Sequence, residues 1–209
     1  MSTLLELKQL TLNYKNYNTS VEVIKGIDLK INSSEKVAVV GKSGSGKTSL
    51  IMLMAGLEQP TSGEIIFDQQ LISTLNEDQL ADIRKKKIGI VFQSFYLIPN
   101  YTALENVSLI LEINSIDNSK QKAEDLLIQF GLKDRLNHFP TQLSGGEQQR
   151  VAIARSMAVN PKLILADEPT GNLDSENSQM ISNLLFEYAN KNQSSFVLVT
   201  HDLKFAEKC

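Results

Sequence analysis

The chain has 209 residues, 42% hydrophobic and 22% charged, which is typical of one large globular domain or of one domain with a small insertion. Its net charge of −3 argues against a nucleic-acid-binding protein that depends on a strong positive field. The single cysteine, Cys209, excludes an internal disulfide and favours a reducing compartment. We find no signal peptide, and no apolar run reaches the roughly 18 residues that span a bilayer, so work at a membrane would need another chain as anchor.

Residues 4–31 alternate between apolar and polar side chains, which predicts a few antiparallel strands with one buried face. The segment 16–20 (Asn-Tyr-Asn-Thr-Ser) predicts a turn or loop between them. Tyr14 stands just before this turn. An exposed aromatic side chain near a nucleotide site can stack on an adenine ring, but at such a position it is more often half-buried core, so both interpretations stay open.

A glycine-rich segment comes next. Residues 37–40 are apolar and predict a strand, 41–48 is Gly-Lys-Ser-Gly-Ser-Gly-Lys-Thr, and the apolar segment 50–55 predicts a helix. Glycines let backbone N–H groups converge on one point, and the helix N-terminus adds partial positive charge there. Lys47 can reach the outer phosphates of a nucleotide, and the Thr48 hydroxyl can ligate Mg²⁺. This context predicts nucleotide binding, in preference to a chance Ser/Gly turn, by Gly41, Lys42, Ser43, Gly44, Ser45, Gly46, Lys47, Thr48 and Ser49.

Between this helix and Gln93 the composition alternates between strand and helix. Residues 60–63 (Pro-Thr-Ser-Gly) predict a turn, and 64–71 has strand composition. Residues 76–87 predict a polar helix that ends in four basic side chains, which we interpret as a solvated face in preference to a contact with a partner or membrane surface. A buried strand is predicted at 88–92, directly before Gln93.

Residues 94–160 have helical composition, with helices predicted at 103–113, 119–130 and 145–158. The third is best marked, because Ser144 and Glu147 form a capping box at its start. A serine and two glycines at a helix N-terminus, here Ser144, Gly145 and Gly146, also make a second anion cradle. It belongs to the helical segment and is too far from the first glycine loop to share one phosphate. We therefore predict that it binds the nucleotide of another copy, in an ATP-sandwiching homodimer.

Two more buried strands are predicted at 162–166 and 196–200, with a helix at 175–191 between them. Apolar strands separated by helices predict an α/β fold with a parallel sheet covered on both faces. Ligands of such sheets lie beyond the carboxyl ends of the strands. The glycine-rich loop, Gln93, Asp167-Glu168 and His201 all follow strands, so we expect them to meet at that edge.

These side chains suit phosphoryl chemistry. Asp167 can hold Mg²⁺ beside Thr48, and Glu168 can polarise a water as general base, which we favour over a mere capping role for both acids. Gln93 can contact the metal or the attacking water. His201 can bind the γ-phosphate or orient the water, although a lone histidine is more often structural.

In the order and identity of these motifs the chain resembles the ATP-binding subunits of ABC transporters over nearly its whole length. The matching motifs are the Walker A loop at 41–48, Gln93, the signature at 143–150 (Leu-Ser-Gly-Gly-Glu-Gln-Gln-Arg), the Walker B stretch at 163–170 (Leu-Ile-Leu-Ala-Asp-Glu-Pro-Thr), the D-loop at 171–174 with Asp174, and the switch histidine His201. The resemblance implies adenine stacking for Tyr14, water activation for Glu168, γ-phosphate contact for His201, and permease contact at 94–100.

The resemblance also implies a P-loop NTPase fold within a single ABC ATPase domain over 1–209. It has an N-terminal antiparallel β-subdomain (about 1–35 and 60–75), a RecA-like ATP-binding core (about 36–59, 76–93 and 160–209) and an inserted helical signature subdomain (about 94–159). Relatives continue beyond the position of Cys209, so we expect either a naturally short member or a truncated one, with a less stable last sheet edge.

The signature and Walker B sequences look like those of the lipoprotein-releasing, macrolide-export and cell-division subgroup. Within it, the sequences of the segments 21–27 and 195–202 favour the lipoprotein-releasing members. The resemblance implies ATP hydrolysis with Mg²⁺, a homodimer, a separate integral membrane permease and a peripheral position on the cytoplasmic face of the inner membrane, without nucleic acid. The alternatives are export of macrolides or peptides, and a cell-division ATPase that signals without transport. An ABC ATPase of DNA repair or translation and a small GTPase fit less well, because the chain has one compact set of motifs and 190–193 lacks a guanine-reading aspartate.

Overall fold

The computed structural model describes residues 2–16 and 19–209. These residues form a four-stranded antiparallel sheet of order β2-β1-β4-β5 and a four-stranded parallel sheet of order β3-β8-β7-β6. The strands are β1 (Thr3–Asn16), β2 (Thr19–Asn32), β3 (Lys36–Val40), β4 (Ser62–Phe67), β5 (Gln70–Leu71), β6 (Ile88–Val91), β7 (Leu163–Asp167) and β8 (Ser195–Thr200). The helices are α1 (Lys47–Met54), α2 (Glu77–Lys87), α3 (Ala103–Ile113), α4 (Ser119–Gln129), α5 (Gly145–Met157), α6 (Ser175–Asn192) and α7 (Leu203–Ala206).

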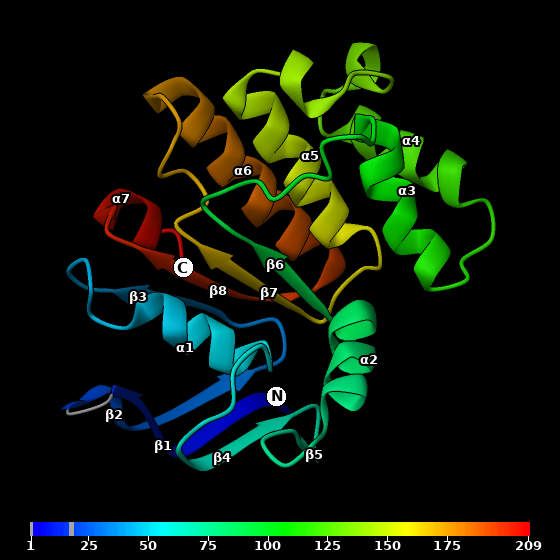
Figure 1. The fold of residues 1–209 in the computed structure, drawn as a ribbon. Coiled ribbons are helices and arrows are strands. Elements are labelled where there is room, and N and C mark those ends of the chain that lie inside the picture. Colours follow the sequence, from blue (N-terminus) through cyan, green and yellow to red (C-terminus); the bar gives the residue numbers. More distant parts are fainter. Residues whose placement is uncertain (1, 17–18) are drawn as a thin grey trace.

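The parallel sheet is the centre of the molecule and is covered on both faces (Figure 1). Alternate side chains of its strands point to opposite faces, as the period of a strand requires. Ile164 and Ala166 of β7 face the cluster built with α3 to α6, whereas Leu163 and Leu165 face α1 and the antiparallel sheet. Burial on both faces explains why β7 and β8 read as continuous apolar runs. The predicted bounds of β3, β6, β7 and β8 agree with the structure to within one residue.

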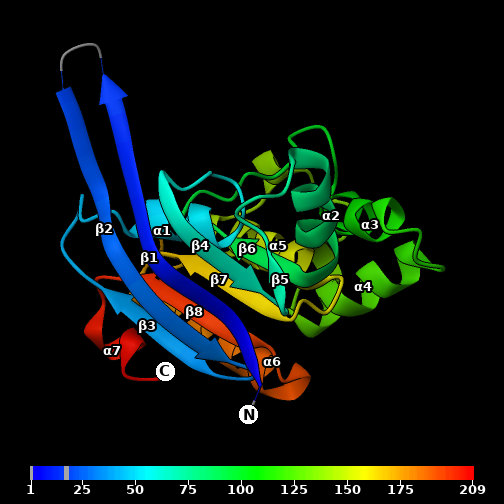
Figure 2. The same cartoon turned by 90° about the horizontal axis from the view of Figure 1, so that it is seen from below.

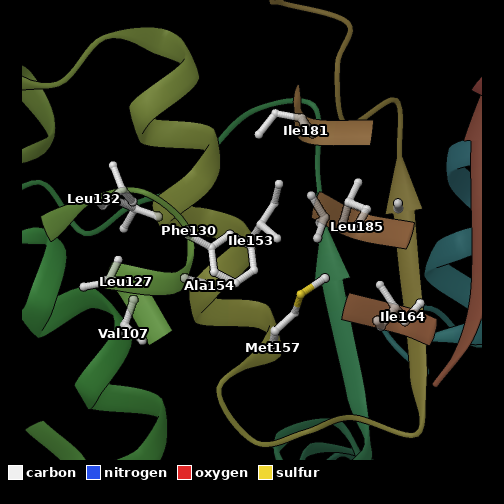
Figure 3. Packing of buried hydrophobic residues seen from close by; sticks show 14 of the residues in the cluster. Val107, Leu127, Phe130, Leu132, Ile153, Ala154, Met157, Ile164, Ile181 and Leu185 are labelled. Atoms are coloured by element: carbon white, nitrogen blue, oxygen red, sulfur yellow. The ribbon is translucent and has the colours of Figure 1, made fainter. Parts of the chain in front are cut away.

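The helical region is held by close apolar packing. Figure 3 shows Val107, Leu127 and Leu132 directed toward Ile153 and Ala154 of α5, and all five side chains are fully buried. Burial of each larger side chain contributes roughly 1.5–3 kcal/mol. The predicted helices agree with α3, α4 and α5 to within one residue at each end. This packing fixes α5, the helix that begins with the signature, against the parallel sheet.

The antiparallel sheet covers the face of the parallel sheet that carries α1 (Figure 2). The antiparallel strands predicted over 4–31 are confirmed as two long strands, β1 and β2, which pair antiparallel through the described part of this segment. A bulge absorbs the break in alternation between Leu7 and Leu10, with Gln9 at φ 45° and its N–H donating to Asp28 Oδ1 over 2.8 Å. Of the predicted 16–20 turn, residues 17–18 lie outside the described residues, and Asn16, Thr19 and Ser20 belong to strands.

The predicted strand at 64–71 is interrupted by a two-residue hairpin turn. Asp68 and Gln69 have φ of 50° and 68°, as a type I′ turn requires, and they join β4 to β5. The Asp68 carboxylate accepts from Lys87 Nζ over 2.7 Å and from Lys162 Nζ over 2.9 Å. This turn therefore links the antiparallel sheet to α2 and to the segment before β7. The basic run at the end of α2 is thus only partly a solvated face.

Candidate nucleotide-binding site

The loop after β3 leaves the N-terminus of α1 open. Its N-cap residue, Gly46, has φ 87°, and no side chain of the described residues caps the helix. A Cβ on Gly46 would lie 2.9 Å from Val23 Cγ1 and 3.0 Å from the Val23 carbonyl oxygen, so only glycine fits where the loop passes β2. The uncapped N–H groups of the first turn are consequently free to bind an anion.

The ammonium group of Lys47 is buried inside this loop. Its side chain is 8% exposed, and Nζ donates to the carbonyl oxygens of Gly41 over 2.9 Å and Lys42 over 3.0 Å. Nζ also lies 4.0 Å from Glu168 Oε1. The fold thus holds a cation at the centre of the loop, where a phosphate bound by the backbone N–H groups would meet it.

A hydroxyl and a carboxylate lie together beside Lys47. Burial raises the pKa of Asp167 above its ordinary value, and the hydrogen bond from the Thr48 hydroxyl partly opposes that shift. Among the described residues no group of three acidic, histidine or cysteine side chains is placed to hold a metal. At nucleotide sites Mg²⁺ is bound by one or two hard oxygen ligands from the protein, and phosphate oxygens complete its coordination shell. The Thr48 hydroxyl and the Asp167 carboxylate therefore fit this ion.

Glu168 has a left-handed backbone conformation, with φ 46°, that costs about 1–3 kcal/mol in a residue other than glycine. Its N–H donates to the Val199 carbonyl over 2.9 Å, which anchors the residue to β8. The carboxylate then lies between Lys47 and His201, with Oε2 2.6 Å from His201 Nδ1. His201 follows β8 and is mostly exposed, with 71% of its side chain accessible.

Gln93, just after β6, is paired with an asparagine that the motif analysis left without a role. Gln93 Nε2 donates to Asn172 Oδ1 over 3.0 Å, and Asn172 Nδ2 donates to the Gln93 carbonyl over 3.1 Å. A Cβ on Gly171 would lie 2.8 Å from Gln93 Nε2, so a larger residue here would displace the Gln93 amide. The only sequence signal for Asn172 was its place in the D-loop.

Lys47, Thr48, Gln93 and the two acids Asp167 and Glu168 line one cavity of about 330 Å³ at the carboxyl edge of the parallel sheet, whereas Asn172 and His201 are not part of its lining. The edge was predicted because each motif follows a strand of the predicted parallel sheet, and the structure brings the Walker A loop and the residues after β6 and β7 together there. Gly41, Lys42 and Ser45 do not line the cavity, and the carbonyls of the first two hold Lys47. The lining residues are Val23, Ser43, Gly44, Gly46, Lys47, Thr48, Ser49, Gln93, Asp167 and Glu168.

The ABC transporter family model matches residues 24–171, which include the cavity residues from Ser43 to Glu168. The chain belongs to this family. It is 44% identical to the lipoprotein-releasing system ATP-binding protein LolD of Idiomarina loihiensis over 98% of this chain and 91% of that protein. It is 43% identical to LolD of Psychrobacter arcticus over 99% of this chain and 92% of that protein. The dimeric ATP-binding cassette MJ0796 bound to ADP and Pi superposes with a TM-score of 0.91 and 41% identity, over 97% of this chain and 90% of that one.

The ABC signature lies outside this cavity. Ser144 caps α5 and accepts from the Glu147 N–H over 3.3 Å, and the Ser144 N–H donates to Glu147 Oε2 over 2.8 Å, which confirms the predicted capping box. A Cβ on Gly146 would lie 2.4 Å from Asn177 Oδ1, so α5 packs closely on α6. Asp174 caps α6 by accepting from the Asn177 N–H over 2.9 Å. None of these residues lines the Walker A cavity.

Tyr14 also lies outside the cavity lining, and the structure excludes the half-buried interpretation. Its side chain is exposed, and its hydroxyl donates to Glu58 Oε2 over 2.7 Å. That contact raises the pKa of the phenol, while a hydrogen bond with Ser49 opposes the shift. Because Ser49 lines the cavity, Tyr14 stands at the margin of the site with an accessible ring.

Proposed function

We propose that this chain is the ATP-hydrolysing subunit of a lipoprotein-releasing ABC transporter, which dimerises on ATP and drives a separate membrane permease. The observation that carries the ATPase assignment is the position of the Glu168 carboxylate, at the cavity between the buried Lys47 ammonium and the His201 imidazole. The similarity to LolD proteins over nearly the whole chain supports the transport system.

The Walker A loop would bind the phosphates. The uncapped N–H groups at the start of α1 and the Lys47 ammonium would donate to the β- and γ-phosphate oxygens, and charge-assisted bonds of this kind are the strong ones. Thr48, Asp167 and Gln93 would hold Mg²⁺. When bound, this ion would neutralise negative charge on the phosphates. Tyr14, whose side chain is exposed at the margin of the site, would stack on the adenine ring.

Glu168 would act as general base. It would accept a proton from the water whose oxygen attacks the γ-phosphorus, while the bond to the β-phosphate oxygen breaks and ADP leaves. His201 would hold the carboxylate in place through Nδ1, which lies 2.6 Å from Oε2, and its imidazole ring would contact the γ-phosphate. Positioning by several fixed groups is the main contribution that a protein makes to phosphoryl transfer.

A second copy would complete the site. Ser144, Gly145 and Gly146 would bind the γ-phosphate held by the partner's Walker A loop, with Glu147 at the same helix start and Asp174 in the contact region. The dimeric state of the MJ0796 cassette supports the participation of a second copy. We also propose the division into β-subdomain, ATP-binding core and helical subdomain at the bounds expected from the sequence.

The permease would contact the segment after Gln93. There the Tyr96 side chain is 68% exposed, and Arg155 of α5 fixes the backbone by donating to the carbonyls of Tyr96 over 2.6 Å and Phe95 over 3.0 Å. No helix of the described residues is both long and apolar enough to cross a membrane. We place the chain at the cytoplasmic face of the inner membrane, held there by the permease.

The Glu168→Gln variant tests the enzymatic assignment. We expect kcat for ATP hydrolysis to fall by a factor of about 100 or more, because the general base is lost, and an ATP-bound dimer to accumulate. Glu187→Gln, on the exposed side of α6, is the matched control and should hydrolyse ATP normally. Near-normal turnover of the Glu168→Gln variant would remove Glu168 from this role.

The same variant tests the transport system. Purified with ATP from its own membranes, Glu168→Gln should retain a permease with a lipoprotein-handling periplasmic domain. Co-elution of a macrolide or peptide exporter, or of a cell-division membrane protein, would move the chain to another branch of the family. If no membrane protein were retained, the proposal of a permease-driving subunit would be wrong.

A further inference from the structure

Gln149 of the signature helix is a buried polar side chain to which the proposed mechanism gives no role. It lies five residues after Ser144, and its side chain is 0% exposed. Its Nε2 donates to two main-chain carbonyl oxygens, that of Phe92 over 3.2 Å and that of Pro169 over 2.6 Å. Burying an amide is favourable only where such hydrogen bonds offset the loss of its bonds to water. Position 149 therefore requires a side chain that can donate hydrogen bonds.

The two acceptors adjoin the proposed catalytic residues. Phe92 directly precedes Gln93, and Pro169 directly follows Glu168. Both lie beyond the last paired residues of their strands, Val91 in β6 and Asp167 in β7. The side chain of Gln149 therefore supports the backbone at the points where both segments leave the parallel sheet.

The same two segments are also joined to each other. The reciprocal bonds between Gln93 and Asn172 connect the segment after β6 to the segment after β7. Gln149 connects both segments to α5, whereas the Arg155 bonds to the Tyr96 and Phe95 carbonyls reach only the segment after β6. Its Oε1 is buried and has no hydrogen-bond partner among the described residues, so the amide is held by its two donor bonds.

We propose that Gln149 is a positioning residue, which holds the backbone beside Gln93 and Glu168 in a fixed position relative to α5, the helix that begins at the signature. The proposal rests on the ATPase function proposed above. Because α5 is a continuous helix that begins at the signature, a nucleotide bound there by a second copy would constrain, through Gln149, the Glu168 carboxylate of the same chain. The residue would thus link the two ATP sites of a dimer.

The Gln149→Met variant tests this role, since methionine has a similar shape and no donor. We expect kcat to fall by about 10- to 100-fold, as misplacement of catalytic groups does, with the KM for ATP within about threefold. Amide hydrogen exchange should accelerate in the segments 93–97 and 170–174. Tyr188→Phe is the control: it removes the Tyr188 hydroxyl that donates to the Met157 carbonyl over 2.7 Å at the far end of α5, and should change neither measurement.

Unchanged kcat, or unchanged exchange in those two segments, would overturn the proposal. A rise in KM without a fall in kcat would do so as well. If the unaltered protein did not hydrolyse ATP, the proposed function would fail, but the exchange measurement would still test the connection. Should Gln149→Met not fold, as judged by thermal unfolding, Gln149→Asn keeps an amide that is one methylene too short to reach both carbonyls, and the same two effects are expected.

Discussion

The molecule contains two glycine-rich helix N-termini, of which one is uncapped and the other is capped by its own side chains. At α1 the N-cap is Gly46, no side chain of the described residues caps the helix, its first turn holds no acidic residue, and the buried Lys47 ammonium adds a full positive charge. At α5 the Ser144 hydroxyl and the Glu147 carboxylate already occupy the helix start. Glu147 Oε1 also accepts from Arg135 Nε over 2.7 Å.

The difference shows how similar local chemistry serves two functions. An open helix N-terminus with a lysine can bind a phosphate without help. A helix start that carries its own carboxylate is stable by itself but repels an anion, so it needs a nucleotide presented by another surface. This asymmetry fits a site in which one chain binds ATP and a second chain closes over it.

The largest effect is expected at the open helix start. Lys47→Ala should weaken ATP binding by the monomer by about 100-fold, because charge-assisted hydrogen bonds to the phosphates are lost. Titration of the purified chain with a fluorescent ATP analogue measures this, and Lys25→Ala on the exposed part of β2 is the control. Unchanged affinity would contradict the assignment of the Walker A loop as the phosphate site.

The second largest effect tests whether the start of α5 serves dimerisation and not ATP binding by the monomer. Ser144→Arg, in the Glu168→Gln background, should abolish the ATP-dependent dimer, since a large cation would fill the signature, while monomer affinity for ATP stays within about twofold. Sedimentation with and without ATP checks the first outcome and titration the second. Ser119→Arg places the same cation at the start of α4 and should leave the dimer intact. A dimer that survived in the Ser144→Arg variant would contradict the two-chain site.

The smallest effect concerns the carboxylate at the signature. Glu147→Gln keeps an acceptor for the Ser144 N–H but removes the charge. The free energy of unfolding should fall by about 0.5 kcal/mol, a small value because Arg135 is partly exposed and solvent screens its ion pair with Glu147. With less repulsion, ATP-driven dimerisation should tighten about threefold. Thermal unfolding and sedimentation measure the two effects. Weaker dimerisation would instead make Glu147 a direct contact to the partner.

The stability difference should depend on pH in a defined direction. The Ser144 N–H, and then the Arg135 guanidinium, hold the pKa of Glu147 below its ordinary value of 4.5. A carboxylate with a lowered folded-state pKa stabilises fully above the unfolded-state pKa, and this contribution is lost as the pH falls through the folded-state pKa. The unaltered protein and Glu147→Gln should therefore differ most above about pH 4.5 and converge below it.

Much of the fold was predictable because its strongest signals are local. The strands β7 and β8 are buried on both faces and read as uninterrupted apolar runs. The start of α5 carries its capping box in four consecutive residues. The bulge at Gln9 and the turn at Asp68-Gln69 were missed, because a non-glycine residue with positive φ leaves no mark in a pattern of apolar and polar residues.

The sequence by itself determined the chemistry available and the edge of the sheet at which it would gather, since motif spacing and the position of each motif after an apolar strand can be read along the chain. It also determined that the signature belongs to a different segment from the Walker A loop. Only the tertiary structure decided that Tyr14 is exposed, that Glu168 contacts both Lys47 and His201, and that Gln149 is buried against Phe92 and Pro169. Those contacts join residues far apart in the chain, and their distances depend on how the helices pack on the sheet.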